Sequence, residues 1–443
     1  MKGYRKHSVV LLVMAMLATA CVSEADPTTT SAAAAAPTTE APATTTADTA
    51  PATSAAPGTG APAVESVTIG SIHPLTGALA GAGIRMDNGA KMAAEEINAA
   101  GGISSLGGAT LEVLSADSTG APEVGQSEAV RLIGEGVSAL IGAYQSAVTT
   151  TIAAVAERDG VALVIDVAVA DSILDQGYTH VFRLQPNATA MGQYGVQFLA
   201  EVAEAAGEEV TTVAYLHEDS GFGASVADAF EAAGAEYGIE VAARIPYPAF
   251  EVTDLTTEMT QAAAVDPDVV IDTGYYPDGL LAARAAVDLN LDIQGFYGVA
   301  QGAYHLPQFT TDFGEDSEFF LNSNYHFDTS DPAVVEVTAR FEEAYGEPMD
   351  TEAMLAYQAI YVVADALERA GSADPAAVRD ALAETNLADH MMAYPGPIAF
   401  DETGETISAQ PVLMQVLDNT VTQVWPEALQ EAEPVYPATS WGQ

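Results

Sequence analysis

The chain has 443 residues, a length that corresponds to two or three domains of ordinary size. Hydrophobic residues make up 49% and charged residues 17% of it, which allows sizeable cores and excludes global disorder. The 62 acidic residues outnumber the 13 basic ones, for a formal net charge of -49, so the chain repels phosphate backbones and no nucleic-acid partner is expected. Its one cysteine, Cys21, excludes an intrachain disulfide and a multi-cysteine metal site.

The first residues have the layout of an export signal. Three basic residues precede an apolar run at 8–18, which is shorter than the ~20 residues of a membrane-spanning helix. Small residues then precede Cys21. This layout resembles a bacterial lipoprotein signal, although Ala18 stands where such signals usually carry leucine. We expect residues 1–20 to be a signal peptide and Cys21 to become the lipidated first residue of the mature chain. Plain secretion with an incidental cysteine is the alternative.

Residues 27–64 consist almost entirely of alanine, threonine and proline and show no apolar periodicity. Such a segment buries too little surface to offset the entropy of ordering it. We therefore expect residues 21–65 to form a flexible tether between the lipid anchor and a globular part that begins at residue 66.

From residue 66 onward, short β-rich runs alternate with amphipathic helical segments. The first series predicts strands at 67–72, 110–116, 139–142 and 162–166, with helices at 86–100, 124–134 and 147–158. The second series predicts strands at 211–215, 240–245, 269–272 and 295–297, with helices at 191–206, 223–233, 255–264 and 279–289. This alternation is typical of parallel sheets covered by helices on both faces, so we expect two doubly wound α/β lobes. The last part predicts helices at 333–345, 351–370 and 375–383 and strands at 397–400, 412–417 and 421–425.

Sequence motifs for catalysis are mostly absent. The chain has no HExxH, no P-loop, no GxSxG and no GxGxxG after a predicted strand. His217 ends a predicted strand and is more simply a loop histidine near a cleft than a catalytic base. Tyr275 follows the strand at 269–272, where open α/β sheets bind their ligands, or else it caps a turn. The sequence offers no paired nucleophile and base, so we do not expect an enzyme, and we expect no cofactor and no metal.

Several motifs resemble one known family in their order and spacing. They are IHPLTG at 72–77, NGA at 88–90, EEINAAGGI at 95–103, QGY at 176–178, GYYP at 274–277 and ALERAG at 366–371. Together they resemble the type I periplasmic binding proteins, and most closely the leucine/isoleucine/valine-binding receptors of ATP-binding-cassette importers. The resemblance covers nearly all of residues 66–443.

The resemblance implies two lobes joined by three crossing segments, near Pro186, Asn322 and Pro395. Lobe 1 would comprise 66–186 plus 322–394, and lobe 2 would comprise 187–321 plus 395–443. It also implies an extracytoplasmic monomer, tethered to the cell membrane, that closes on a small molecule and presents it to a membrane permease.

Carried over residue by residue, the resemblance implies a ligand site between the lobes. Ser146 takes the place of a serine that holds the ligand carboxylate, and Ala168 that of an alanine whose carbonyl group contacts the ligand. Val169 stands where the family carries a threonine, so that hydroxyl is missing. Phe222 and Tyr275 take aromatic positions on lobe 2.

The ammonium side of the implied site differs more from the family. Gln301 falls where a glutamate pairs with the ligand ammonium, and a one-residue ambiguity in the register selects Ala300 instead. Ala82 replaces an aromatic residue of the first loop. Asp166 and Asp171 flank the second loop and are either substitute anionic partners or solvated and capping carboxylates.

We expect the receptor of an importer for an amino acid, of the branched-chain kind, or for a related small polar solute. The alternatives are a receptor for a non-amino-acid ligand, such as an amide, urea or an aromatic acid, and a ligand-sensing subunit of a membrane signalling system.

Overall fold

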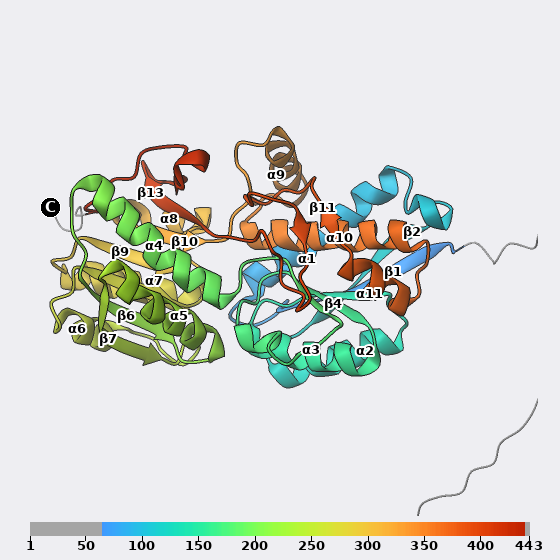
Figure 1. The fold of residues 1–443 in the computed structure, drawn as a ribbon, viewed down its shortest axis with the longest axis horizontal. Helices are drawn as coiled ribbons and strands as arrows, with labels where there is room; N and C mark the ends of the chain where they lie inside the picture. Colours follow the sequence, from blue (N-terminus) through green and yellow to red (C-terminus); the bar gives the residue numbers. More distant parts are fainter. Residues whose placement is uncertain (1–63, 439–443) are drawn as a thin grey trace, which may run out of the picture. The chain divides into compact units, whose positions relative to one another are not determined.

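The computed structural model describes residues 64–438. Cys21, the expected signal peptide at 1–20 and nearly all of the expected tether at 21–65 lie outside these residues. Within them the chain forms two α/β lobes, each built on a mainly parallel sheet (Figure 1), and this confirms the predicted fold class.

The sheet of lobe 1 has five parallel strands in the order β2-β1-β3-β4-β5. They are β1 (Ser66–His73), β2 (Thr110–Asp117), β3 (Ala139–Gly142), β4 (Ala162–Ile165) and β5 (Val181–Arg183). The helices of this lobe are α1 (Ala80–Ala99), α2 (Pro122–Gly134), α3 (Ser146–Asp159), α10 (Thr351–Ala370) and α11 (Pro375–Ala383).

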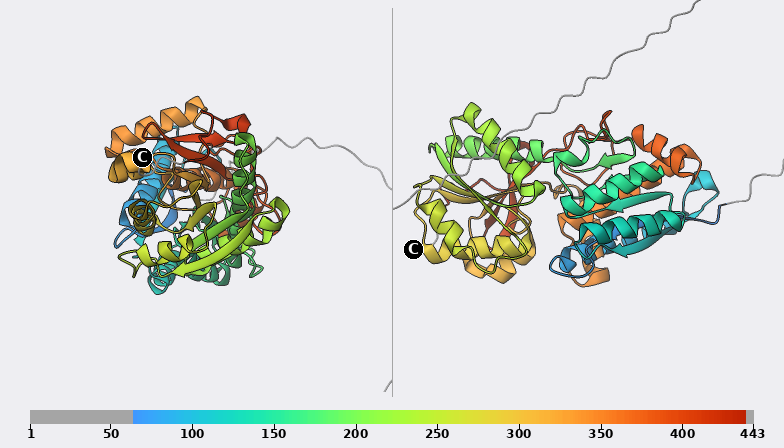
Figure 2. Two further views of the ribbon diagram at one scale, coloured as in Figure 1. Left: turned by 90° about the vertical axis from the view of Figure 1, so that its left-hand side faces the viewer. Right: turned by 90° about the horizontal axis from the view of Figure 1, so that it is seen from below.

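Both faces of this sheet are buried, because successive strand residues point to opposite sides and both sides are apolar. Ile69 and Ile141 belong to a core shared with α1 and α10. Leu140 and Leu163 belong to a second core shared with α2 and α3. Figure 2 shows the resulting layers of helix, sheet and helix.

The sheet of lobe 2 has seven strands in the order β14-β13-β10-β9-β8-β6-β7, of which β13 and β14 are antiparallel additions at one edge. The strands are β6 (Thr212–Glu218), β7 (Glu240–Tyr247), β8 (Val269–Thr273), β9 (Gly295–Val299), β10 (Leu321–Asn324), β13 (Val412–Leu417) and β14 (Thr420–Trp425). Its helices are α4 (Ala188–Ala206), α5 (Gly221–Tyr237), α6 (Thr256–Ala263), α7 (Tyr276–Leu289) and α8 (Pro307–Phe313). Helix α4 packs on α5, and α6 packs on α7.

Three segments connect the lobes. The first runs between β5 and α4. The second connecting segment follows Asn324, because β10 pairs with β9 and β13 and so still belongs to lobe 2. Helix α9 (Pro332–Tyr345) comes after this segment. The third follows Thr406, because β12 (Ile398–Ala399) pairs with β11 (Asn386–Leu387) and Glu405 bridges to Arg183. The third crossing therefore comes later in the chain than the position expected near Pro395.

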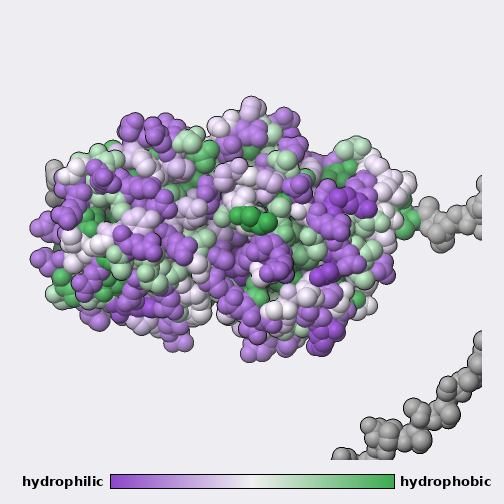
Figure 3. Space-filling model, in the orientation of Figure 1, coloured by the Kyte–Doolittle hydropathy of each residue, from purple (hydrophilic) through white to green (hydrophobic). Residues whose placement is uncertain are grey.

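The visible face of the described residues is mainly hydrophilic (Figure 3), in line with the excess of acidic side chains. None of the helices between residues 64 and 438 combines the length and the apolar character that crossing a membrane requires.

Candidate functional site

A cavity lies between the two lobes and is lined by residues of both. Its lining residues are Tyr144, Ser146, Val167, Val169, Phe222, Gly274, Tyr275, Ala300, Gly302 and Tyr325.

Every lining residue comes just after the carboxyl end of a strand. Tyr144 and Ser146 follow β3, Val167 and Val169 follow β4, and the rest follow β6, β8, β9 and β10. Parallel sheets place their connecting loops at this edge, and open α/β sheets bind their ligands there. The cavity therefore occupies the position that the fold class favours for a ligand.

Ser146 forms the polar part of the lobe 1 wall. It is the first residue of α3, and its Oγ accepts a hydrogen bond of 3.2 Å from the backbone N–H of Ala170. Because that oxygen acts as an acceptor, the hydroxyl proton remains available to a ligand. The amino-terminal turn of α3 adds backbone N–H groups and the positive end of the helix dipole, which favour an anionic group.

Aromatic rings join the two lobes across the cavity. Tyr144 of lobe 1 and Tyr275 of lobe 2 have ring centroids 5.9 Å apart. Tyr275 also lies 5.3 Å from Phe222 and is stacked on Phe250 at 5.1 Å. Phe250 is 53% exposed, so this cluster runs from the cavity to the protein surface.

Three tyrosine hydroxyls lack a protein partner. Tyr144, Tyr275 and Tyr325 are each 6% exposed, and in the described part of the chain no hydrogen bond involves any of their hydroxyl groups. A tyrosine hydroxyl can both donate and accept a hydrogen bond, so these three groups are available to a ligand. Burial raises the pKa of Tyr275 well above its ordinary value, with a further contribution from Glu218, so at neutral pH this hydroxyl is protonated and can donate.

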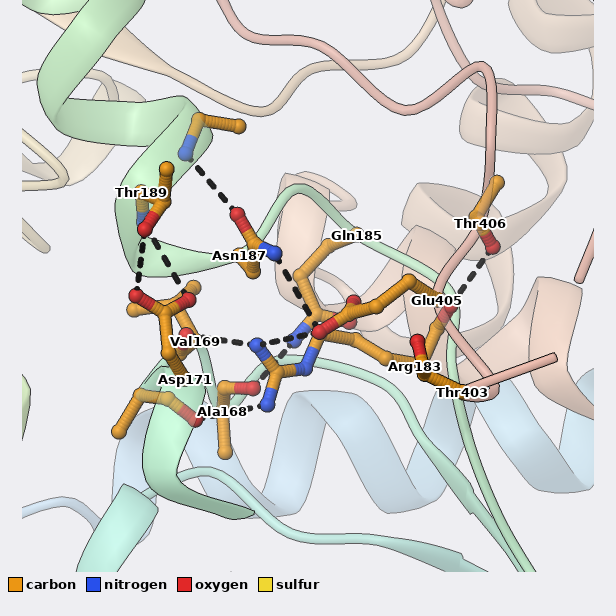
Figure 4. A network of polar contacts seen from close by, with 12 residues as sticks. Ala168, Val169, Asp171, Arg183, Gln185, Asn187, Thr189, Thr403, Glu405 and Thr406 are labelled. Atoms are coloured by element: carbon orange, nitrogen blue, oxygen red, sulfur yellow. Dashed lines mark hydrogen bonds and ion pairs between the residues drawn. The ribbon is translucent and has the colours of Figure 1, made fainter. Parts of the chain in front are cut away.

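The loop after β4 is fixed from behind by two buried side chains (Figure 4). Arg183 donates from Nη1 to the carbonyl of Val169 and from Nη2 to that of Ala170, each at 2.7 Å. Gln185 Nε2 donates to the carbonyl of Ala168 at 2.6 Å. The carbonyl of Ala168 is thus engaged inside the protein, and Ala168 does not line the cavity.

The side chain of Gln301 also points into the protein. Its Nε2 donates to Asp272 at 2.7 Å, and its Oε1 accepts from the N–H of Ala303 at 2.8 Å. Burial raises the pKa of Asp272 to about 6, although hydrogen bonds from Gln301 and two tyrosines oppose this rise. Ala300, the other member of the register ambiguity, lines the cavity, as does Gly302 of the same loop.

The two aspartates that flank the loop after β4 have protein partners. Asp166 Oδ2 lies 2.7 Å from His73 Nε2, and both side chains are fully buried. Its Oδ1 has no partner among the described residues. Asp171 accepts hydrogen bonds from the N–H and the hydroxyl of Thr189 at the start of α4. Neither aspartate lines the cavity, and neither does Ala82.

The structure thus brings together Ser146, Val169, Phe222 and Tyr275 of the residues that the resemblance implied, and it leaves Ala168 and Gln301 outside the lining. Sequence reasoning did not find Tyr144, Val167, Gly274, Gly302 and Tyr325. Most of these come one to three residues after a predicted strand, and this position was the available signal. Tyr325 follows β10, which the sequence pattern did not predict.

A buried ion pair connects the lobes beside this cavity. His305 follows β9 of lobe 2 in the chain. Its Nε2 lies 3.1 Å from Oε1 of Glu352, which is on α10 of lobe 1. Burial alone would lower the pKa of His305, but the Glu352 carboxylate outweighs it and raises that pKa. The pair therefore contributes to the lobe contact when His305 is protonated.

The chain belongs to the periplasmic binding protein family, whose sequence model matches residues 66–420. A curated relative is the "Leu/Ile/Val-binding protein homolog 7" of Brucella suis, 28% identical over 383 residues that cover 83% of this chain and 93% of the relative. The fold resembles the leucine binding protein LivK of Thermotoga maritima, with TM-score 0.70, 24% identity, and 81% and 98% of the two chains covered. It also resembles an R. palustris solute binding protein solved with benzoate, with TM-score 0.69, 19% identity, and 84% and 99% covered. The chain is therefore a binding protein and not an enzyme.

Proposed function

We propose that the protein is the extracytoplasmic substrate-binding component of an ATP-binding-cassette importer. In this proposal it holds a small carboxylate-bearing solute, an amino acid or a related acid, between its two lobes and presents it to a membrane permease. The observation that carries the proposal is the cavity lined from both lobes, with Ser146 and the start of α3 on one wall and Tyr275 on the other.

Such a receptor works by a shift of population. A ligand that contacts both walls stabilises the closed arrangement by as much as it prefers that arrangement over the open one. The Tyr144–Tyr275 and His305–Glu352 contacts already link the lobes and would favour closure together with the ligand. The permease then distinguishes closed from open receptor by the relative position of the lobes.

The relatives support a carboxylate as the shared chemical feature of the ligand. The Brucella suis relative carries Leu/Ile/Val binding in its name, the Thermotoga maritima protein is a leucine binding protein, and the R. palustris protein was solved with benzoate. All of these small molecules carry a carboxylate, which suits a serine hydroxyl at the amino-terminus of a helix.

The test is calorimetric titration with a panel of amino acids, carboxylates and amides, followed by cavity variants with the ligand found. Ser146→Ala should weaken binding by roughly 1–2 kcal/mol through one lost hydrogen bond. Tyr275→Ala should weaken it by roughly 2–4 kcal/mol, since it removes ring contacts as well as a hydroxyl. Matched controls are Ser127→Ala and Tyr237→Ala, which alter exposed helix positions outside the cavity lining. Unchanged affinity in both cavity variants would contradict the site.

The proposal includes a lipid anchor at Cys21, which rests on the sequence layout alone. In a host that processes lipoproteins, the full chain should fractionate with membranes, and Cys21→Ser should release it. Equal membrane association of both forms would show that Cys21 is not the anchor.

A further inference from the structure

The first observation concerns the charge of the cavity wall. None of the described residues that line the cavity is Asp, Glu, Lys, Arg or His. An ammonium group is a donor that loses its hydration when it is buried, and it needs anionic or carbonyl acceptors in return. The side chains of this wall provide only hydroxyl oxygens for that purpose.

The second observation concerns the loop after β4, whose backbone would be the next source of acceptors. Three consecutive carbonyl groups of this loop already accept hydrogen bonds of 2.6–2.7 Å from Arg183 and Gln185. Both donors are fully buried, so these bonds do not give way to solvent when a ligand arrives.

The third observation concerns the opposite wall. Ala300 presents a methyl group to the cavity, while the amide of Gln301 is held by Asp272 and by Ala303 N–H. The carboxylate of Asp166 is held by His73 at 2.7 Å and lies outside the lining. No acidic side chain of the described residues lines the cavity itself.

The remaining polar groups of the cavity are suited to an anion. Ser146 and the hydroxyls of Tyr144, Tyr275 and Tyr325 can donate hydrogen bonds, and the start of α3 adds backbone N–H groups. The rest of the wall is apolar or aromatic, namely Val167, Val169 and Phe222, which fits a hydrophobic ligand body.

We infer that the ligand of this cavity is a monocarboxylate with an apolar, aryl or branched body and without an ammonium group next to the carboxylate. This inference rests on the proposed function and specifies its substrate class. An α-amino acid of the same body would bury its ammonium group at a wall that has no acidic side chain.

The test compares acids that differ only in the amino group, at neutral pH, by calorimetric titration of the purified chain. The pairs are 3-phenylpropanoate with phenylalanine, phenylacetate with phenylglycine, and 4-methylpentanoate with leucine. In each pair that binds, the acid without the amino group should bind at least about tenfold more tightly, because a buried ammonium group without a partner carries a large desolvation penalty.

Two results overturn the inference and leave the receptor assignment intact. One is tighter binding of the amino acid in these pairs, and the other is binding of a neutral amide or urea with no binding of any carboxylate. Absence of binding by every solute in the panel contradicts the proposed function itself.

A variant tests the charge argument directly. Ala300 has φ 52°, in the left-handed region that Asp and Asn tolerate better than most residues. Ala300→Asp should place a carboxylate at the cavity wall and reduce the preference for the des-amino acid at least about tenfold, as expected for a new ion pair in a poorly solvated site. Ala300→Asn is the matched uncharged control and should keep most of the preference. An equal reduction in both variants would show that shape and not charge sets the preference, which overturns the inference.

Discussion

At the scale of single residues, Arg183 has the greatest influence on the geometry of the site. It is fully buried, donates to the carbonyl groups of Val169 and Ala170, and lies 3.5 Å from Glu405. Replacing it with an apolar residue of similar length removes one hydrogen bond from each of two carbonyl groups and the ion-pair partner of one carboxylate.

We therefore predict that Arg183→Met lowers the free energy of unfolding by about 3–5 kcal/mol, the range seen when one member of a buried ion pair is removed. Urea unfolding of the two proteins measures this difference. Arg158→Ala is the control, since Arg158 is exposed and its ion pair is with the adjacent Asp159. A stability of Arg183→Met equal to that of the parent would mean that the loop does not depend on this side chain.

His326 gives the chain a defined sensitivity to acid. It is buried beside Thr351 and near His305, and burial, with the charge of His305, lowers its pKa to about 3. The unfolded chain has the ordinary value of about 6.5, so between these values the unfolded state binds one more proton and stability falls as the pH falls.

We predict that His326→Gln, which keeps a hydrogen-bonding group for Thr351, loses less stability than the parent on acidification. The difference between the two proteins should change by up to about 1.4 kcal/mol per pH unit between about pH 6 and pH 4. Urea unfolding at several pH values measures it. Parallel stability curves would show that His326 is not kept neutral by the fold.

The positions of most cavity residues were predictable at this scale, but not the orientation of all their side chains. Ser146, Val169, Phe222 and Tyr275 each follow a strand that the apolar pattern predicts, and this suffices to place them at the edge of a sheet. Ala168 and Gln301 come at equally suitable positions. Their polar groups are engaged by Gln185 and Asp272, partners 17 and 29 residues away, and local sequence does not specify such pairings.

At the scale of elements, the contact between α1 and α10 holds the second chain segment of lobe 1 against the first. Gly89 on α1 faces the backbone of Ala353 on α10, and a Cβ atom at position 89 would collide with the carbonyl oxygen of Ala353. Only glycine lets the two helices come this close.

Gly89→Ala should therefore destabilise the protein by about 1–3 kcal/mol, as is typical of overpacking in a well-packed core. Gly134→Ala is the matched control: Gly134 also lies in a helix, and a Cβ there meets no atom within 4 Å. It should be neutral or stabilising by up to ~1 kcal/mol because alanine is the better helix former. Thermal unfolding measures the melting temperatures of both variants. Similar melting temperatures for Gly89→Ala and Gly134→Ala would contradict the packing argument.

The long, apolar elements were predictable from the sequence, and the short ones were not. The alternating runs predicted the central strands of both sheets and most of the larger helices, nearly all within a few residues of their observed bounds, and with them the two-lobe architecture. Strand β10 has the sequence LNSN and is fully buried, and Asn322 and Asn324 both donate to the carbonyl of Gln301. Its polar residues gave no strand pattern, and β5, with three residues, was too short to show one.

At the scale of the whole molecule, the charge should govern how fast a ligand arrives. The formal net charge of -49 repels an anion over distances set by the Debye length, which falls from about 30 Å at 0.01 M salt to about 8 Å at 0.15 M. A ligand anion should therefore associate more slowly at low salt, while its dissociation from the closed cavity changes little.

We predict that the association rate constant of a bound monocarboxylate rises several-fold between about 0.01 M and 0.15 M salt. Stopped-flow mixing at a series of salt concentrations measures it. A zwitterionic or neutral solute that binds the same cavity serves as the reference and should show a nearly constant rate. An association rate for the anion that decreases with salt would contradict the role of the overall charge.

The division of lobe 1 into two chain segments has a consequence for biosynthesis. Its five strands are complete once the ribosome has passed Arg183, but α10 and α11, which cover one face of their sheet, end at Ala370 and Ala383. Until those helices have been translated, the face that carries Ile69 and Ile141 is covered by α1 alone, so the lobe cannot finish folding as the chain emerges. A lobe that completes its fold only when the last third of the chain has been made leaves the polypeptide threadable for longer, which favours translocation across a membrane in extended form.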